Sequence, residues 1–201
     1  MMMRRFVVAI VTVCLALTMA GCSRSPRVTF YTLESGVQPA TAAATMAIPS
    51  VSVGPITLPD VVARPQFVVR IAANRVEILE MHRWAEPLKS EIPRLIAENM
   101  NRLLGSSRVS SYLQHSGADA DCRVLVDIQR FESSPGEAVT VDAVWSLRCA
   151  AGGTQKNGRT TVREPVGAEG YDPLVAAYGR ALFAVSSDLA KAIRAEATVG
   201  H

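Results

Sequence analysis

Alternation of hydrophobic and polar residues predicts several β-strands along the chain. The clearest are 121–132 and 137–150, which a Ser-Ser-Pro-Gly turn at 133–136 separates. A strand-like segment at 48–58 contains Pro49 and Pro55 and is followed by Pro59, and these prolines predict an edge strand or a strand with a bulge. The remaining stretches with strand character are 28–33, 67–71, 76–79, 108–113 and 158–166, of which 67–71 and 76–79 form a predicted hairpin.

Two longer stretches, 86–104 and 171–195, have apolar residues at helical spacing. In the first, either Ser90 is the N-cap with Pro93 in the first turn, or the helix kinks at Pro93. The second begins at Asp172 as N-cap and has the apolar stripe Leu174, Tyr178, Ala181, Leu182, Val185, Leu189 and Ile193. The order strands, helix, strands, helix predicts an α/β fold with a mixed β-sheet packed by two long amphipathic helices.

The N-terminus has the features of an export signal. Two arginines precede an uncharged apolar run at 6–19, which is too short to span a bilayer. The following Met19-Ala20-Gly21-Cys22 resembles the bacterial lipobox, so residues 1–21 are a predicted signal peptide and Cys22 is the predicted lipidation site. Three acyl chains on Cys22, palmitate among them, exceed what stable anchoring requires. Because Ser23 follows rather than the aspartate of inner-membrane lipoproteins, we expect the outer membrane.

Residues 22–27 then form a lipidated cysteine with a short tether, and 28–197 form a single domain. Five extended residues, 23–27, reach about 17 Å at most, which keeps the domain close to its membrane. With 49% hydrophobic residues and a net charge of +3, the 201-residue chain is not disordered. Loss of Arg4 and Arg5 with the signal peptide leaves 19 basic and 18 acidic residues, which excludes nucleic acid as a partner.

The cysteines of the mature domain are predicted to form a disulfide. If the hairpin of 121–132 and 137–150 is centred between Pro135 and Gly136, the numbers of paired residues add to 271, as those of Cys122 and Cys149 do. The two cysteines then face each other at a separation that a disulfide accepts. Two reduced, buried cysteines remain the alternative.

Catalytic chemistry lacks its minimum parts in this sequence. The histidines are His82, His115 and His201, and none lies in a recognisable arrangement with a serine or cysteine nucleophile. Metal-ligand spacing and a phosphate-binding glycine loop are also missing. We therefore expect no enzyme activity, no metal and no cofactor.

Two segments carry a resemblance to a known family. They are Val51-Ser52-Val53-Gly54-Pro55-Ile56-Thr57-Leu58-Pro59 with Arg64-Pro65-Gln66, and Arg83-Trp84-Ala85-Glu86-Pro87-Leu88. Together they resemble the auxiliary lipoprotein component of ABC-type transporters, the family of paraquat-inducible protein C. The resemblance implies an α/β fold similar to the N-terminal domain of TolB. It also implies a non-catalytic accessory role beside proteins of the mammalian-cell-entry (MCE) type, in systems that move lipids across the envelope.

Four residues of these segments are the expected partner-binding residues: Arg64, Gln66, Arg83 and Trp84. Exposed arginine and tryptophan side chains are common interface anchors, and the expected partner is an MCE-domain periplasmic protein or an ABC transporter component. The alternative is structural, with Trp84 packed between helix and sheet and Arg64 bonded to loop carbonyls. A second function also stays open, that of a lipid or small-ligand carrier with an apolar cavity between sheet and helix. The sequence does not decide whether the chain forms a homo-oligomer.

Overall fold

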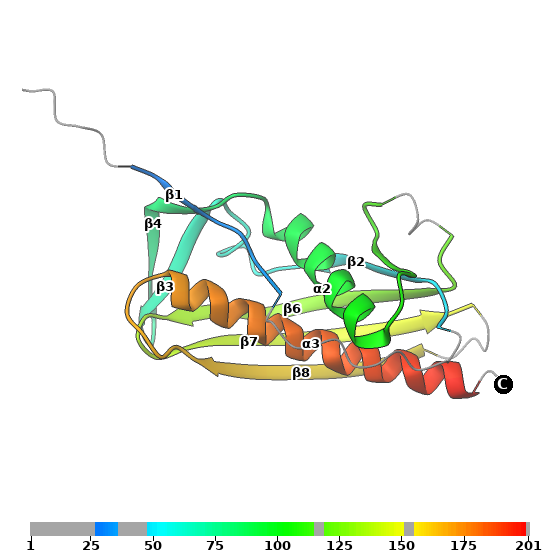
Figure 1. Cartoon of the computed structure of the whole chain (residues 1–201). Coiled ribbons are helices and arrows are strands. Elements are labelled where there is room, and N and C mark those ends of the chain that lie inside the picture. Colours follow the sequence, from blue (N-terminus) through cyan, green and yellow to red (C-terminus); the bar gives the residue numbers. More distant parts are fainter. Residues whose placement is uncertain (1–26, 36–47, 115–118, 151–154, 200–201) are drawn as a thin grey trace, which may run out of the picture.

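The computed structural model describes residues 27–35, 48–114, 119–150 and 155–199 (Figure 1). The expected signal peptide at 1–21, Cys22 and His115 lie outside these ranges. Two sheets and two helices make up the described part of the chain, which confirms the mixed α/β class. The strands divide between a five-stranded and a three-stranded sheet.

The larger sheet has the order β5-β2-β6-β7-β8 and is mixed. Its strands are β5 (Val109–Ser111), β2 (Val51–Thr57), β6 (Cys122–Ser134), β7 (Ala138–Cys149) and β8 (Gln155–Pro165). Strand β2 runs parallel to both β5 and β6, whereas β6, β7 and β8 are antiparallel. The edge-strand interpretation of 48–58 is therefore wrong, and the bulge interpretation is correct. The register shift falls between Val53 and Ile56, where Gly54 has a φ of 108°.

The smaller sheet has the order β1-β4-β3. The predicted hairpin is confirmed as β3 (Gln66–Ala72) and β4 (Arg75–Trp84), and β1 (Thr29–Tyr31) runs parallel to β4. Strand β4 is longer than predicted and continues past Leu79 to Trp84. Its pairing with β3 shifts register between Gln66 and Phe67. Side chains join this sheet to β6, since Ser133 Oγ donates to the Val68 carbonyl at 3.2 Å.

Both helices lie side by side on one face of the five-stranded sheet (Figure 1). Helix α2 (Leu88–Leu104) begins two residues before Ser90 and contains Pro93, so the prediction of Ser90 as N-cap is wrong. It ends at Gly105, whose φ of 60° is the left-handed conformation typical of a helix C-terminus. Helix α3 (Asp172–Val199) covers β7 and β8.

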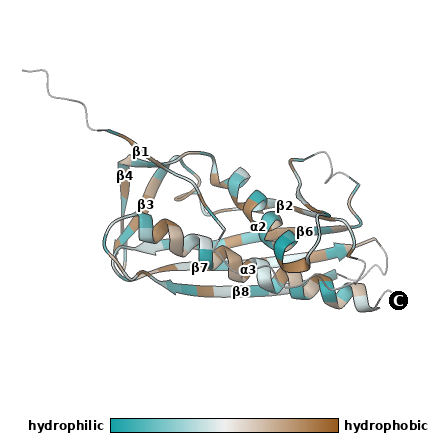
Figure 2. Ribbon diagram, in the orientation of Figure 1, coloured by the Kyte–Doolittle hydropathy of each residue, from teal (hydrophilic) through white to brown (hydrophobic). Residues whose placement is uncertain are grey.

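The core fills the layer between helices and sheet. All seven residues of the predicted α3 stripe are at most 1% exposed, which confirms that stripe. From the sheet side, Val51, Val124 and Val141 are fully buried against them. Figure 2 shows the corresponding alternation of hydrophobic and hydrophilic residues along the helices and strands. In the ranges that the structure describes, neither helix combines the length and hydropathy that a membrane crossing requires.

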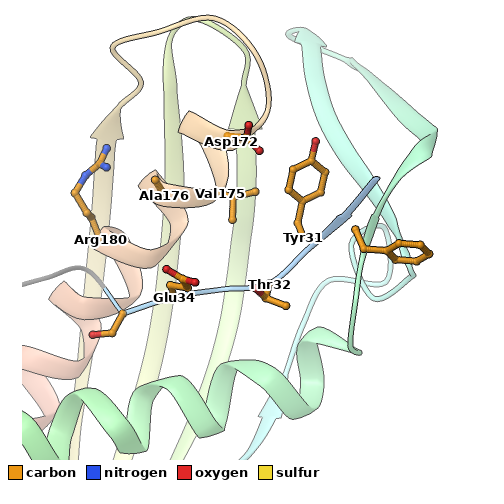
Figure 3. A pocket seen from close by; sticks show the side chains of 9 residues that line it. Tyr31, Thr32, Glu34, Asp172, Val175, Ala176 and Arg180 are labelled. Carbon is orange, nitrogen blue, oxygen red and sulfur yellow. The ribbon is translucent and has the colours of Figure 1, made fainter. Parts of the chain in front are cut away.

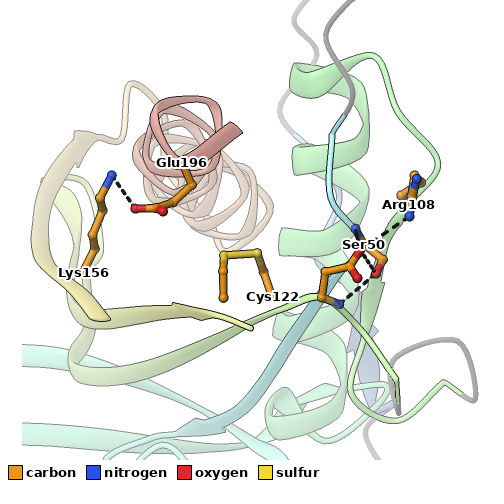
Figure 4. Close-up of a disulfide and its surroundings, with 7 residues drawn as sticks. Ser50, Arg108, Cys122, Lys156 and Glu196 are labelled. Atoms are coloured by element: carbon orange, nitrogen blue, oxygen red, sulfur yellow. Dashed lines mark hydrogen bonds and ion pairs between the residues drawn. A yellow bond between two sulfur atoms is a disulfide. The ribbon is translucent and has the colours of Figure 1, made fainter. Parts of the chain in front are cut away.

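The predicted register is confirmed, because Cys122 lies opposite Cys149 on the neighbouring strand. The structure has a disulfide at this position, with a Cα–Cα distance of 4.0 Å (Figure 4). Two deviations cancel to give this register. The hairpin turn is shifted by one residue, so that Ser134 pairs with Ala138, and a bulge between Ile128 and Arg130 shifts the strands back. The sequence of the turn gave no sign of the bulge. Beyond the bulge, from Ile128 to Cys122, the strands pair in the predicted register.

Candidate functional site

The four expected partner-binding residues meet at one corner, where β3 begins and β4 ends. Gln66 pairs with Arg83 in the antiparallel ladder. The Trp84 backbone nitrogen donates to the Pro65 carbonyl at 2.7 Å, which places Arg64 next to the start of α2. We call the surface formed by residues 63–66 and 83–89 the β3–β4 corner.

A pocket of about 340 Å³ opens in the β3–β4 corner. Its walls are mainly apolar and its charged members are Arg64, Glu86 and Lys89; the apolar lining comprises Ala63, Pro65, Trp84, Ala85, Pro87 and Leu88. Glu86 is turned toward Arg94 of α2 at 3.4 Å. An apolar floor with a charged rim is suited to a hydrophobic anchor residue that carries polar neighbours.

Trp84 is not the exposed anchor that its sequence context suggested. Only 5% of the residue is exposed. Its ring lies 4.9 Å from that of Phe67, 6.0 Å from that of Tyr178 of α3 and 6.5 Å from that of Phe131. Trp84 thus ties the β3–β4 hairpin to the core and contributes one wall of the pocket.

Gln66 and Arg83 lie at the rim of the β3–β4 corner and share a partner. Gln66 Nε2 donates to Glu80 Oε2 at 3.3 Å, and Arg83 Nε donates to the Glu80 carbonyl at 3.0 Å. The ion pair between Arg83 and Glu80 is exposed and spans 3.5 Å. Exposed pairs of this kind contribute little stability, so both side chains are available to a partner at small cost.

The segment that follows β1 crosses the helices and is held there by buried polar groups. The Leu33 backbone nitrogen donates to Glu91 Oε1 at 2.7 Å, and Ser35 hydrogen-bonds Asn99. Burial raises the pKa of the Glu91 carboxyl, and the hydrogen bond from Leu33 opposes that rise. Glu91 and Asn99 are fully buried on α2. The apolar spacing of this helix in the sequence did not indicate a role for either residue.

A second pocket, of about 500 Å³, lies between this segment and the start of α3 (Figure 3). Phe30, Glu34, Asp172 and Arg180 are among its lining residues. Arg180 is already engaged, because its Nε donates to Glu164 Oε2 at 3.1 Å. The sequence assigned Asp172 only a capping role, and no motif pointed to the pocket.

Tyr31 closes one side of the second pocket. Its hydroxyl lies 2.8 Å from His82 Nδ1 in a hydrogen bond. Burial, followed by the negative charge of Asp172, raises the pKa of Tyr31. The role of His82 is therefore structural, as the hydrogen-bond partner of Tyr31. In the described ranges, no three potential ligand residues gather in a way that could hold a metal ion.

Comparison with known proteins places the chain in a family. The family described as "ABC-type transport auxiliary lipoprotein component" matches residues 31–190. The chain belongs to this family. The match includes the five-stranded sheet, β3 and β4 of the smaller sheet, α2 and most of α3, and with them the whole β3–β4 corner; of β1 it includes only Tyr31. The protein is thus an auxiliary transport lipoprotein, a class that associates with a membrane.

Solved structures of low sequence identity share the fold. An uncharacterized protein has a TM-score of 0.68 at 18% identity, with 84% of this chain and 99% of that chain covered. Protein XCC0632 from Xanthomonas campestris, assigned to family DUF330, has a TM-score of 0.65 at 18% identity, with 81% and 92% covered. A search of curated proteins found no match. The similarity expected to the N-terminal domain of TolB stays a prediction.

Proposed function

We propose that this chain is a non-catalytic accessory lipoprotein of an ABC/MCE-type transport system, anchored in the outer membrane through Cys22. In this proposal the β3–β4 corner docks on an MCE-domain periplasmic protein or on a component of the transporter. The family match supports the transport role, and the pocket between Arg64 and Lys89 supports docking. The observation that carries the proposal is this open, charge-rimmed pocket within the family's matched region.

The position of β1 supports the same arrangement. Strand β1 starts seven residues after Cys22 and pairs with the end of β4, so that Tyr31 lies opposite Trp84. The Ala85 backbone nitrogen also donates to the Tyr31 carbonyl at 2.8 Å. The β3–β4 corner therefore lies beside the strand that leads to the anchor, and a partner bound there is held near the membrane.

The alternative of a carrier with an interior cavity receives less support. Such a carrier needs free volume between sheet and helices. That layer is occupied by side chains that are at most 1% exposed, among them Leu174, Tyr178, Leu182 and Leu189. Both pockets described above are open to the surface instead. Docking is the function that this geometry supports best.

Photo-crosslinking in the native envelope tests the proposal. A photoreactive residue is placed at Arg64, at Gln66 or at Lys89, and at Arg102 and Arg163 as exposed controls away from the β3–β4 corner. We expect a crosslink to an MCE-domain protein or a transporter component from the corner positions only. Equal crosslinks from the control positions, or no such crosslink from the corner, contradict the docking proposal.

A further inference from the structure

Exposed hydrophobic residues of the described chain are concentrated in the three-stranded sheet. Its strands β1, β3 and β4, of 3, 7 and 10 residues, carry four large apolar side chains that are at least 38% exposed: Phe30, Ile71, Val76 and Ile78. The five-stranded sheet, in which β6, β7 and β8 alone have 13, 12 and 11 residues, carries one, Leu125, among its described residues. Single exposed apolar residues are normal on a protein surface, whereas a concentration of them indicates an interaction site.

The turn of the β3–β4 hairpin is apolar for a turn. Residues 71–76 have the sequence Ile-Ala-Ala-Asn-Arg-Val, and all six are exposed. The turn of the β6–β7 hairpin at 134–137 is Ser-Pro-Gly-Glu, which is the composition expected where a turn faces water. The two hairpins of the same domain therefore differ in what their turns are suited to contact. We call residues 71–76 the hairpin tip.

The charge of the hairpin tip suits an anionic lipid surface. Arg75 is the one ionisable residue of its six. Glu77 follows the tip, but it alternates with Val76 and Ile78 along β4, so its carboxylate points to the other face of the strand. Arg70 Nη1 donates to the Ala73 carbonyl at 2.8 Å. This bond satisfies a backbone acceptor in the turn, which lowers the cost of taking the tip out of water.

Strand β1 brings the expected lipid anchor to the same end of the molecule. Figure 1 shows β1, β3 and β4 together at one end. Strand β1 is parallel to β4 with Thr29 opposite His82, so the chain enters β1 from the direction in which β4 begins, at the hairpin tip. Seven residues lead from Cys22 to Thr29 and seven from Arg75 to His82, and each stretch spans at most about 25 Å. The chain is therefore short enough to hold the tip against the membrane.

Phe30 and Val28 extend the apolar surface toward the anchor. Phe30 is 63% exposed and Val28, two residues earlier, is exposed as well. Phe30 is eight residues from Cys22, so the same limited reach applies to its ring. Aromatic and aliphatic side chains beside basic ones are typical of protein segments that lie in the interface of a membrane.

We propose that the hairpin tip and Phe30 insert shallowly into the surface of the membrane that holds the acyl chains of Cys22. This inference rests on the lipid anchor of the proposed function. The anchor makes a weak contact sufficient, because it keeps the tip at a high local concentration beside the lipid. A lipid surface suits the tip better than a second copy, since two tips in contact would bring two Arg75 charges together.

The membrane contact leaves the β3–β4 corner free. The corner lies where β3 begins and β4 ends, whereas the hairpin tip lies at the other end of the same two strands. A domain held by its anchor and by the tip has a fixed orientation on the membrane. Its corner is then presented to a partner in a constant direction.

Fluorescence quenching on the acylated full-length protein in vesicles tests this contact. The dye NBD is attached to a cysteine introduced by A73C in the hairpin tip, or by S107C as the control. Ser107 is also a small exposed loop residue, but it follows the far end of α2, a helix about 26 Å long. The vesicles contain phosphatidylethanolamine and phosphatidylglycerol, with a doxyl-labelled lipid as quencher. Flotation of the same samples measures anchoring.

We expect the doxyl lipid to quench the dye at position 73 at least twofold more strongly than the dye at position 107, with emission shifted to shorter wavelength. I71S/V76S in the A73C protein should remove most of this excess. The matched variant L113S/L125S, which removes two exposed leucines elsewhere, should leave it unchanged. All variants should float equally, because the anchor is the same.

Equal quenching at positions 73 and 107 in protein that floats overturns the membrane contact and leaves the anchor and the docking proposal intact. An emission shift at position 73 without quenching by the doxyl lipid overturns the lipid assignment, since protein, such as a second copy of the chain, then covers the tip. Protein that does not float overturns the anchor and, with it, this contact.

Discussion

Glu91 in the first turn of α2 accepts a hydrogen bond from the backbone nitrogen of Leu33 over 2.7 Å, although 58 residues separate them in the chain. This contact fixes the segment that links β1, and through it the expected lipid anchor, to the helical layer. Its cost is a fully buried carboxyl whose Oε2 has no hydrogen-bond partner among the described residues. The arrangement makes stability depend on pH.

The sign of this dependence follows from the raised pKa of Glu91. A raised pKa means that folding favours the protonated carboxyl, so its contribution is complete below the unfolded value of about 4.3 and is lost as pH rises through the folded value. Glu91→Gln removes this titration. We expect the stability of the variant relative to wild type to increase between pH 4 and pH 8 in urea unfolding.

The same comparison contains its control. Glu98 on α2 is exposed, so E98Q makes the same substitution on the same helix without removing a buried carboxyl. A constant difference between E91Q and wild type across this range contradicts a raised pKa in the folded protein.

Substitutions of Trp84 and Arg64 distinguish a residue that packs in the core from one that is proposed to contact a partner. Trp84→Ala removes a ring that contacts Phe67, Phe131 and Tyr178, and we expect a loss of about 3–5 kcal/mol in the free energy of unfolding. Arg64→Ala should change it by less than about 0.5 kcal/mol, because the side chain is exposed. Chemical denaturation measures both. A large loss for R64A, or a negligible one for W84A, reverses the assignment of the two residues.

Periodicity was enough to predict the helices and the long hairpin. The α3 stripe and the facing cysteines depend on local spacing, which the sequence contains. The division into two sheets was not predictable in this way. Nothing local in the alternation of β2 indicates that it pairs in parallel with β5 and β6, because such pairing joins strands far apart in the chain.

The candidate site was predictable only in part. The resemblance brought together Arg64, Gln66 and Arg83, and the structure places them at one corner. For Trp84 the sequence left both an interface role and packing between helix and sheet open, because an aromatic residue at a strand end is compatible with either, and the structure shows the packed position. Glu91 was missed because a glutamate near a helix start normally faces solvent.

Gly158 of β8 makes room for the ring of Trp145. A Cβ at this position would lie 2.1 Å from Trp145 Cζ2, and Trp145 Nε1 donates to Thr160 Oγ1 at 3.2 Å. Gly158→Ala therefore displaces the ring, with an expected loss of about 1–3 kcal/mol in thermal or urea unfolding. Gly167→Ala, where nothing lies within 4 Å, is the matched control and should be neutral. Equal effects of the two substitutions contradict this close packing.

The disulfide closes the ends of β6 and β7, whose cysteines are 27 residues apart in the chain. Replacement of Cys122 and Cys149 by alanine should lower the free energy of unfolding by about 2–4 kcal/mol, mainly because the unfolded chain gains freedom. Urea unfolding of this variant and of reduced wild type should agree. If a reductant does not change wild-type stability, the two cysteines are not bonded in the isolated protein.

The central claim is that Cys22 anchors an accessory transport protein, and intact-mass measurement with membrane fractionation of wild type and Cys22→Ser tests it most directly. We predict that wild type begins at an acylated residue 22 and fractionates with the outer membrane, whereas the variant carries no acyl mass, is not cleaved before residue 22 and leaves that fraction. Cleavage at the same bond together with an unchanged outer-membrane fraction for the variant contradicts the claim.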